Sequence, residues 1–195
     1  MSDLNDIHDL VDDAKEEFPA KEDLKDRLVA IWVTGKHGVR QGTGAGSKPY
    51  PWYETVTLVL DDGPNWTGMK IVDEEQQEML VPSVAENGPQ RLDNFQHTTS
   101  GITQRLSARV QDVAGSTPKV NGAPVTGTPK SFKPMLGRIN SRKNKQSGFN
   151  ASWSISTPTE ADYDIVRKHV DLISSINAEM EKAASVVDEG DEFDA

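Results

Sequence analysis

The chain has no cysteine among its 195 residues, which excludes disulfide bonds and thiolate metal sites. Apolar residues make up only 35% of it, below the roughly 45–50% of ordinary soluble domains. No apolar run approaches the about 20 residues that a membrane helix needs, and the first residues lack the basic and apolar regions of a signal peptide. We therefore expect a soluble, intracellular protein with one core of roughly 120–140 residues and polar ends.

Acidic residues are almost missing from the middle of the chain. Between Asn94 and Thr159 there are nine basic residues and one acid, Asp112. The first 26 residues hold ten acids and three lysines, and the last 36 hold eleven acids and three bases. Although the net charge is −10, this block pattern indicates a polyanion-binding site flanked by acidic segments that could compete for it.

Patterns that mark catalytic or metal sites are also missing. The four histidines have no metal-ligand spacing: His8, His37, His97 and His169. The glycines at 42, 44 and 46 lack the following Gly-Lys-Ser/Thr of a phosphate-binding loop. No nucleophile–base pattern is readable. We predict no enzymatic activity and no cofactor.

Short segments of alternating or β-branched residues predict strands at 28–33, 52–61, 66–72, 91–97, 135–142 and 149–155. A glycine-rich loop is expected at 35–51, a turn at Asp62-Gly63-Pro64 and a longer loop at 114–134. A helix is expected at 99–113. A helix between the third and fourth strands of a small sheet is typical of the OB-fold, a five-stranded barrel. The fold class is therefore predicted as mainly β with flanking helices.

Both ends of the chain predict helices. Residues 3–18 have an apolar face among acids, typical of a mobile arm or of a helix docked on the surface. Thr157, Pro158 and Glu160 predict a capped helix to about residue 187. Its seven-residue apolar repeat favours packing on the barrel or on another helix. The predicted domains are an acidic arm (1–25), the barrel (26–157), the helix (158–187) and a disordered acidic tail (188–195).

Single-strand binding needs cations that follow phosphates and flat side chains on which bases stack. We predict a DNA-binding surface made of three groups, in the first loop, in the segment before the last hairpin and in that hairpin: Lys36, Arg40, Lys48, Tyr50, Trp52 and Tyr53; Lys130, Phe132 and Lys133; Arg138, Arg142, Lys143 and Lys145. Tyr53 shares a strand face with Thr55 and Thr57, which favours it as an exposed stacking residue. Trp32 and Trp153 are predicted to be core residues. In an OB-fold the loops between strands 1 and 2 and between strands 4 and 5 flank the binding face.

The acidic tail places five acids around one aromatic residue, Phe193. Three interpretations stay open. The tail could fold back on the basic groove, present Phe193 to a partner protein, or only increase solubility.

Three segments carry a family resemblance: Glu54-Thr55-Val56-Thr57-Leu58-Val59-Leu60-Asp61-Asp62-Gly63, Asp93-Asn94-Phe95-Gln96, and Met135-Leu136-Gly137-Arg138-Ile139 with Trp153 and Thr157-Pro158-Thr159-Glu160-Ala161-Asp162. In these segments the chain resembles the single-stranded DNA-binding proteins of tailed phages of actinobacteria. The resemblance implies an OB-fold and a role in phage DNA replication or recombination in the host cytoplasm. The chain ends Phe193-Asp194-Ala195 and lacks the proline-phenylalanine end of bacterial partner-binding tails.

Two alternatives to single-strand binding remain open. One is a phage structural or adaptor protein that oligomerises through its C-terminal helix. The other is an accessory protein of a nucleic-acid enzyme that binds duplex or RNA.

Overall fold

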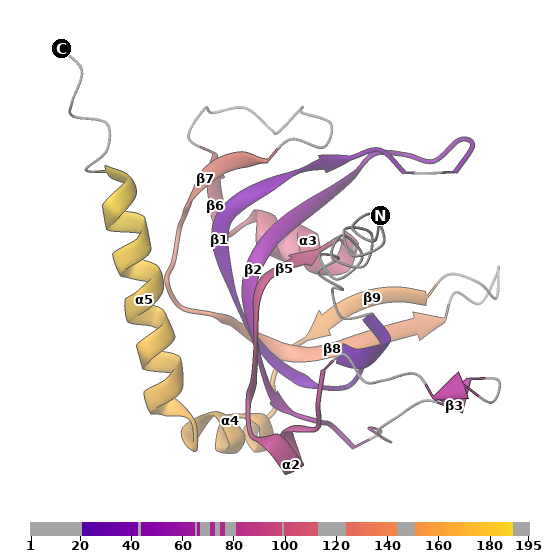
Figure 1. Cartoon of the computed structure of the whole chain (residues 1–195), viewed down its shortest axis with the longest axis vertical. Helices are drawn as coiled ribbons and strands as arrows, with labels where there is room; N and C mark the ends of the chain where they lie inside the picture. Colours follow the sequence, from indigo (N-terminus) through magenta and orange to yellow (C-terminus); the bar gives the residue numbers. More distant parts are fainter. Residues whose placement is uncertain are drawn as a thin grey trace, which may run out of the picture.

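The computed structural model describes residues 21–42, 44–64, 66, 71–72, 75–76, 81–98, 100–112, 124–143 and 151–188. The elements are, in order, η1 (Lys21–Leu24), β1 (Leu28–Arg40), β2 (Tyr50–Asp61), β3 (Ile71–Val72), β4 (Glu75–Gln76), α2 (Val84–Asn87), β5 (Gln90–His97), α3 (Ser100–Ser107), β6 (Val110–Asp112), β7 (Val125–Pro129), β8 (Met135–Lys143), β9 (Ala151–Ser156), α4 (Glu160–Arg167) and α5 (Val170–Asp188). Strands dominate and helices surround them (Figure 1), so the predicted mainly-β class with flanking helices is confirmed.

All strands except β3 and β4 form one seven-stranded antiparallel sheet, in which β1 is the central strand. β1 pairs along one side with β2, which in turn pairs with β5. Along its other side, residues 28–31 of β1 pair with β8 and residues 36–37 pair with β7. The change of partner falls at an irregularity containing Gly35, whose φ is +94°. No pairing joins β5 to β9 among the described strands, so a closed five-stranded barrel is not confirmed.

The sheet has a core on each face, because the apolar run in β1 buries alternate residues on opposite sides. Val29 and Ile31 face the inner core, where Leu106 of α3 packs. Trp32 faces the outer core, where Ile176 and Met180 of α5 pack. Figure 1 shows α5 running along the outside of the curved sheet, with α3 on the other side of the strands. The prediction that Trp32 and Trp153 are core residues is confirmed.

The C-terminal segment forms two helices and not the single helix predicted. A turn at Lys168 and His169 separates α4 from α5. The cap of α4 is Thr159 and not Thr157: its side chain accepts from the Asp162 N–H, and the Asp162 carboxylate accepts from the Thr159 N–H, which makes a capping box. The predicted partner Glu160 is exposed.

Polar contacts also attach α5 to the sheet. The Trp32 indole donates to Asn177 Oδ1 at 2.7 Å. Arg91 on the edge strand β5 makes two hydrogen bonds to the Glu179 carboxylate, of 2.6 and 2.8 Å. These bonds hold the pKa of Glu179 below its usual value. The apolar and polar contacts together fix the helix on the outer face.

Three of the predicted boundaries are wrong. The segment predicted as a loop at 35–51 is strand at both of its ends, because β1 continues to residue 40 and β2 begins at residue 50. The predicted loop at 114–134 contains β7. The predicted helix at 99–113 ends at residue 107 and is followed by β6. The predicted strand at 66–72 is described only at 66 and at 71–72, where β3 lies. The predicted N-terminal helix at 3–18 lies outside the described residues.

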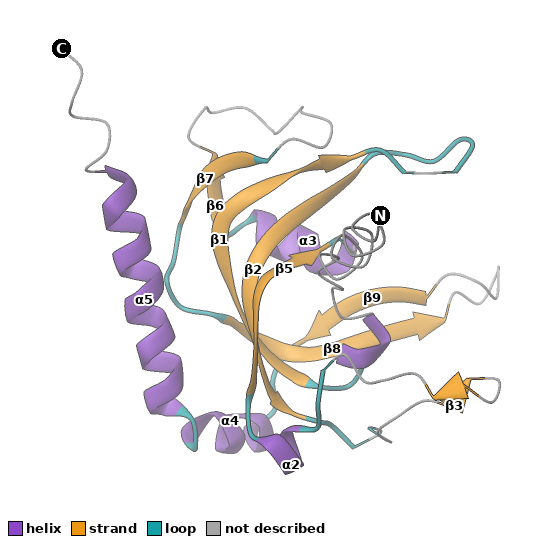
Figure 2. Ribbon diagram, viewed as in Figure 1, coloured by secondary structure: helices purple, strands orange, loops and turns teal. Residues whose placement is uncertain are grey.

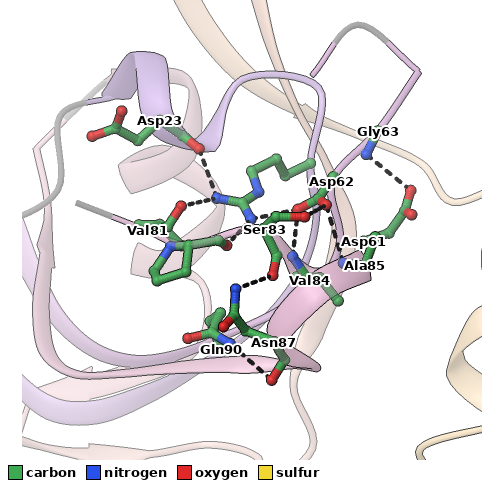
Figure 3. A network of polar contacts seen from close by, with 12 residues as sticks. Asp23, Asp61, Asp62, Gly63, Val81, Ser83, Val84, Ala85, Asn87 and Gln90 are labelled. Atoms are coloured by element: carbon green, nitrogen blue, oxygen red, sulfur yellow. Dashed lines mark hydrogen bonds and ion pairs between the residues drawn. The ribbon is translucent and has the colours of Figure 1, made fainter. Parts of the chain in front are cut away.

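A buried ion pair between Arg27 and Asp62 lies at one end of the sheet (Figure 3). Arg27 has no exposed surface, and its Nη2 donates to Asp62 Oδ1 at 2.6 Å. The same guanidinium donates to the carbonyls of Val81 and Pro82. The Asp62 carboxylate accepts from the Ser83 hydroxyl at 2.6 Å and from two backbone N–H groups at the start of α2. This network joins the ends of β1 and β2 to the segment at 81–87.

Burial disfavours the charge on each partner of this pair. Burial lowers the pKa of Arg27, although the Asp62 carboxylate opposes that change. Burial alone would raise the pKa of Asp62, but the bonds from Ser83, the α2 backbone and Arg27 outweigh it, and the pKa stays below its usual value. Asp62 is therefore ionised at neutral pH, and an arginine guanidinium stays protonated in proteins.

Within the described part of the chain, every helix is too short or too polar to span a bilayer.

Candidate nucleic-acid interface

The hairpin formed by β1 and β2 carries one set of the predicted binding residues. Lys36, Arg40 and Lys48 are exposed on it, and Tyr50 is half-buried. Lys36 lies 3.6 Å from Glu54 but keeps 57% of its side chain exposed. No acidic residue stands between Asp26 and Glu54 in the sequence. The hairpin is therefore a cationic arm with an accessible aromatic ring.

Trp52 is less accessible than the prediction requires, at 3% exposed. Its ring packs on Gly38, where an added Cβ would lie only 2.8 Å from the indole Nε1. The Arg40 guanidinium lies over the ring, 5.4 Å from its centroid, in a cation–π contact. Trp52 would stack on a base only if Arg40 moved away.

The prediction that Tyr53 is an exposed stacking residue is wrong. Tyr53 is 9% exposed and its ring stacks on His37, with centroids 5.6 Å apart. Burial raises the pKa of Tyr53, opposed by a hydrogen bond with Ser107 on α3. The alternation of β2 assigned Tyr53 to the correct face, but α3 covers that face.

Arg138 is predicted to face DNA, but in the structure its guanidinium contacts carboxylates of the same chain. Its guanidinium forms ion pairs with Asp162, at 2.6 Å, and with Asp61, at 2.8 Å, and donates to the Asp26 carbonyl. Only 21% of its side chain is exposed. Burial alone would raise the pKa of Asp162, but bonds from Thr159 and Arg138 hold it below its usual value. Arg138 therefore connects β8 to the start of α4 and to the end of β2.

The remaining residues of the last hairpin are described in part. The backbones of Arg142 and Lys143 pair with Ser152 and Ala151 near the far end of β8 and β9. Lys145 lies outside the described residues, as does Phe193 of the tail. In Figure 1 the far ends of this hairpin and of the β1–β2 hairpin both lie on the right-hand side of the molecule. No acidic residue stands between Asp112 and Glu160 in the sequence, so neither hairpin carries a carboxylate near its end.

Lys130, Phe132 and Lys133 do not join these hairpins. They lie in the connection from β7 to β8, which runs between the sheet and α5 (Figure 2). Phe132 packs against the outer core that contains Ile176 and Met180. The structure therefore places Lys130 and Lys133 on a different side of the molecule from the hairpin ends.

Arg109 belongs to the second group and is not among the predicted site residues. Its carbonyl accepts from the Lys130 N–H at 2.8 Å, and its Nη1 donates to the Lys133 carbonyl at 3.0 Å. The sequence pattern places Arg109 within a helix. Its true neighbours depend on the pairing of β6 with β7, for which no local pattern exists.

A comparison of the chain with models of protein families, with curated proteins and with solved structures gives no significant match. Within the described ranges, no group of three or more histidine and carboxylate side chains is placed to hold a metal ion.

Proposed function

We propose that this protein binds single-stranded DNA without sequence preference and without catalysis, in phage DNA replication or recombination in the host cytoplasm. The observation that carries the proposal is that the β1–β2 and β8–β9 hairpins have no acidic residue near their far ends, and that these ends lie on the same side of the molecule.

The strand order supports the proposal. β5, β2, β1, β8 and β9 follow one another through antiparallel pairs, and α3 stands between β5 and β8 in the chain. An OB-fold has this order and is partly open, and its first and last hairpin loops flank the oligonucleotide. The two hairpins here occupy the corresponding positions. β6 and β7 are then an insertion between the helix and the fourth strand.

The mechanism follows from the exposed groups of the β1–β2 hairpin. Lys36, Arg40 and Lys48 provide separate positive charges for successive phosphates, and Tyr50 provides a face for a base. Single-strand binding through phosphates weakens with salt, with a log–log slope of roughly 0.7 for each contact. Because the contacts are to phosphate and to base faces, the mechanism predicts little sequence preference.

The alternative of a phage structural or adaptor protein has less support from the structure. This alternative relied on the apolar stripe of the C-terminal helix as a surface for a second helix. Ile173, Ile176 and Met180 of that stripe pack on the sheet of the same chain. Exposed apolar residues on α4 and α5, namely Tyr163, Val170, Leu172 and Val186, are the remaining surface for such a contact.

Titration of a fluorescently labelled oligo-dT strand with the protein, followed by anisotropy at two salt concentrations, tests the proposal. A label on the DNA is preferable to tryptophan emission, because Trp32, Trp52 and Trp153 are buried. We expect binding that is tighter at low salt, similar for a mixed-sequence strand, and weaker for a matched duplex. No binding at low salt, or equal binding to the duplex, would contradict it.

A further inference from the structure

The turn after α3 and the β7–β8 connection bring three basic residues into one small area, on the side of the sheet away from the hairpin ends. They are Arg109, Lys130 and Lys133. Two hydrogen bonds fix their spacing, from the Lys130 N–H to the Arg109 carbonyl at 2.8 Å and from Arg109 Nη1 to the Lys133 carbonyl at 3.0 Å. Lys130 is thus joined to the Arg109 backbone, and Lys133 to the Arg109 side chain, so the three residues are adjacent and not merely on the same side of the molecule.

The connection that carries the two lysines is held in one shape. The Lys133 N–H donates to the Ser131 hydroxyl at 3.2 Å. Phe132, between the lysines and half-buried, packs into the outer core. Lys130 and Lys133 are themselves exposed. A rigid loop that projects two lysines loses little conformational freedom when an anion binds.

Among the described residues, the three side chains of this cluster have no acidic partner. None of the three residues takes part in any ion pair found among the described side chains. Four other arginines differ from Arg109 in this respect, since Arg27, Arg91, Arg138 and Arg167 each pair with a carboxylate. Arg109 is half-buried, and only its Nη1 makes a described hydrogen bond, so its other N–H groups remain available.

We propose that Arg109, Lys130 and Lys133 form a second phosphate-binding site, which holds the phosphodiester backbone of the same DNA strand beyond the hairpins. The fork of an arginine can bind one phosphate with two parallel hydrogen bonds, and the lysines add point charges beside it. This inference rests on the proposed function, because it takes single-stranded DNA as the ligand. It predicts that a long strand passes from the hairpin side around the molecule to the α5 side.

The test compares three variants of the full chain by titrating a long labelled oligo-dT strand over a range of salt concentrations. Lys130→Gln with Lys133→Gln removes the exposed charges of the second site. Lys36→Gln with Arg40→Gln removes charges of the β1–β2 hairpin. Lys168→Gln with Lys182→Gln is the matched control, because both lysines are exposed, one in the turn between α4 and α5 and the other on α5. A thermal melt of each variant checks that the fold is kept.

We expect the second-site variant to lower the log–log salt slope by about 1.4, at roughly 0.7 for each of two contacts, while the control leaves it unchanged. The proposal is overturned if the second-site variant matches the control although the hairpin variant lowers the slope, and the proposed function then still stands. If the wild-type protein binds no strand, the proposed function fails first. A parallel titration with poly-aspartate tests for an acidic protein partner. If the second-site variant loses binding to poly-aspartate but keeps binding to oligo-dT, the site is assigned to an acidic protein and the proposal is also overturned.

Discussion

The guanidinium of Arg138 on β8 lies 2.6 Å from the carboxylate of Asp162 in the first turn of α4. The carboxylate is 3% exposed and also closes the capping box of α4 with Thr159. The residue that sequence patterning assigned to DNA therefore fixes the C-terminal helices to the sheet.

Replacing Arg138 by alanine is predicted to destabilise the fold by about 3 kcal/mol, because it leaves the buried carboxylate of Asp162 without its charged partner. Urea unfolding measures the change. Arg167 is the control, since it pairs on the surface with Glu160 and Asp164, and its replacement by alanine should leave stability close to that of the wild type because exposed ion pairs contribute little. If Arg138→Ala kept full stability but lost DNA binding, the original assignment to the DNA site would be correct.

Substitutions of Arg27 and Asp62, the buried pair, should have strongly non-additive effects on the free energy of unfolding. Asp62→Asn leaves an unexposed guanidinium without a counter-charge, and we expect a loss of about 3 kcal/mol. The double variant Arg27→Met with Asp62→Leu removes both charges and should lose clearly less than the sum of the single losses. A double-mutant cycle by denaturant unfolding measures the coupling, and additive losses would show that the two charges do not depend on each other.

His97 makes the fold sensitive to mild acid. Its ring is buried, bonds to the Thr57 hydroxyl at 3.1 Å, and has its pKa lowered by burial to about 3. The unfolded chain takes up a proton near the ordinary pKa of about 6.5, so it binds more protons than the folded state between roughly pH 6.5 and 3. Stability should therefore fall as pH decreases through this range, by about 1.4 kcal/mol for each unit well below 6.5.

Urea unfolding of the wild type and of His97→Gln at several pH values tests this prediction. The variant should be less stable at neutral pH but should lack the decline between roughly pH 6 and 4.5. The carboxylates of Asp62 and Asp162 also have lowered pKa values, but their contributions disappear mainly below about pH 4. Parallel pH curves for the two proteins would contradict the assignment to His97.

Gly35 is required where β1 changes its partner from β8 to β7. Its φ is +94°, and an added Cβ would lie 2.2 Å from the Gly127 carbonyl oxygen. Gly35→Ala should cost about 2 kcal/mol or more, because both the backbone angle and the space exclude a side chain. At Gly44 nothing lies within 4 Å of an added Cβ, so Gly44→Ala should melt within a few degrees of the wild type. If Gly35→Ala melted at the same temperature as the wild type, β1 would be shown to change partner without a glycine at this position.

Local patterns are sufficient to predict part of this fold. β2, β5, β8 and β9 are all expected close to their observed positions, because each shows alternation or β-branched residues within its own sequence. β7 is missed because Thr-Gly-Thr-Pro has no such pattern, and its strand depends on pairing with distant residues of β1 and β6.

The candidate site is harder to predict than the strands. The alternation of β8 places Arg138 on the correct strand face, but it gives no sign that Asp61 and Asp162 reach the guanidinium. The sequence likewise gives no sign that α3 covers Tyr53, or that β6 brings Arg109 beside Lys130. Each of these contacts joins residues that are far apart in the chain.

The most direct measurement compares the salt dependence of oligo-dT binding by the wild type and by a triple variant of the β1–β2 hairpin, Lys36→Gln, Arg40→Gln and Lys48→Gln. All three side chains are exposed, so the melting temperature should be retained. If this hairpin binds the phosphates of single-stranded DNA, the log–log slope should fall by about 2, at roughly 0.7 for each cation removed, and affinity at low salt should fall with it. An unchanged slope and affinity in a folded triple variant would contradict single-strand binding by this hairpin.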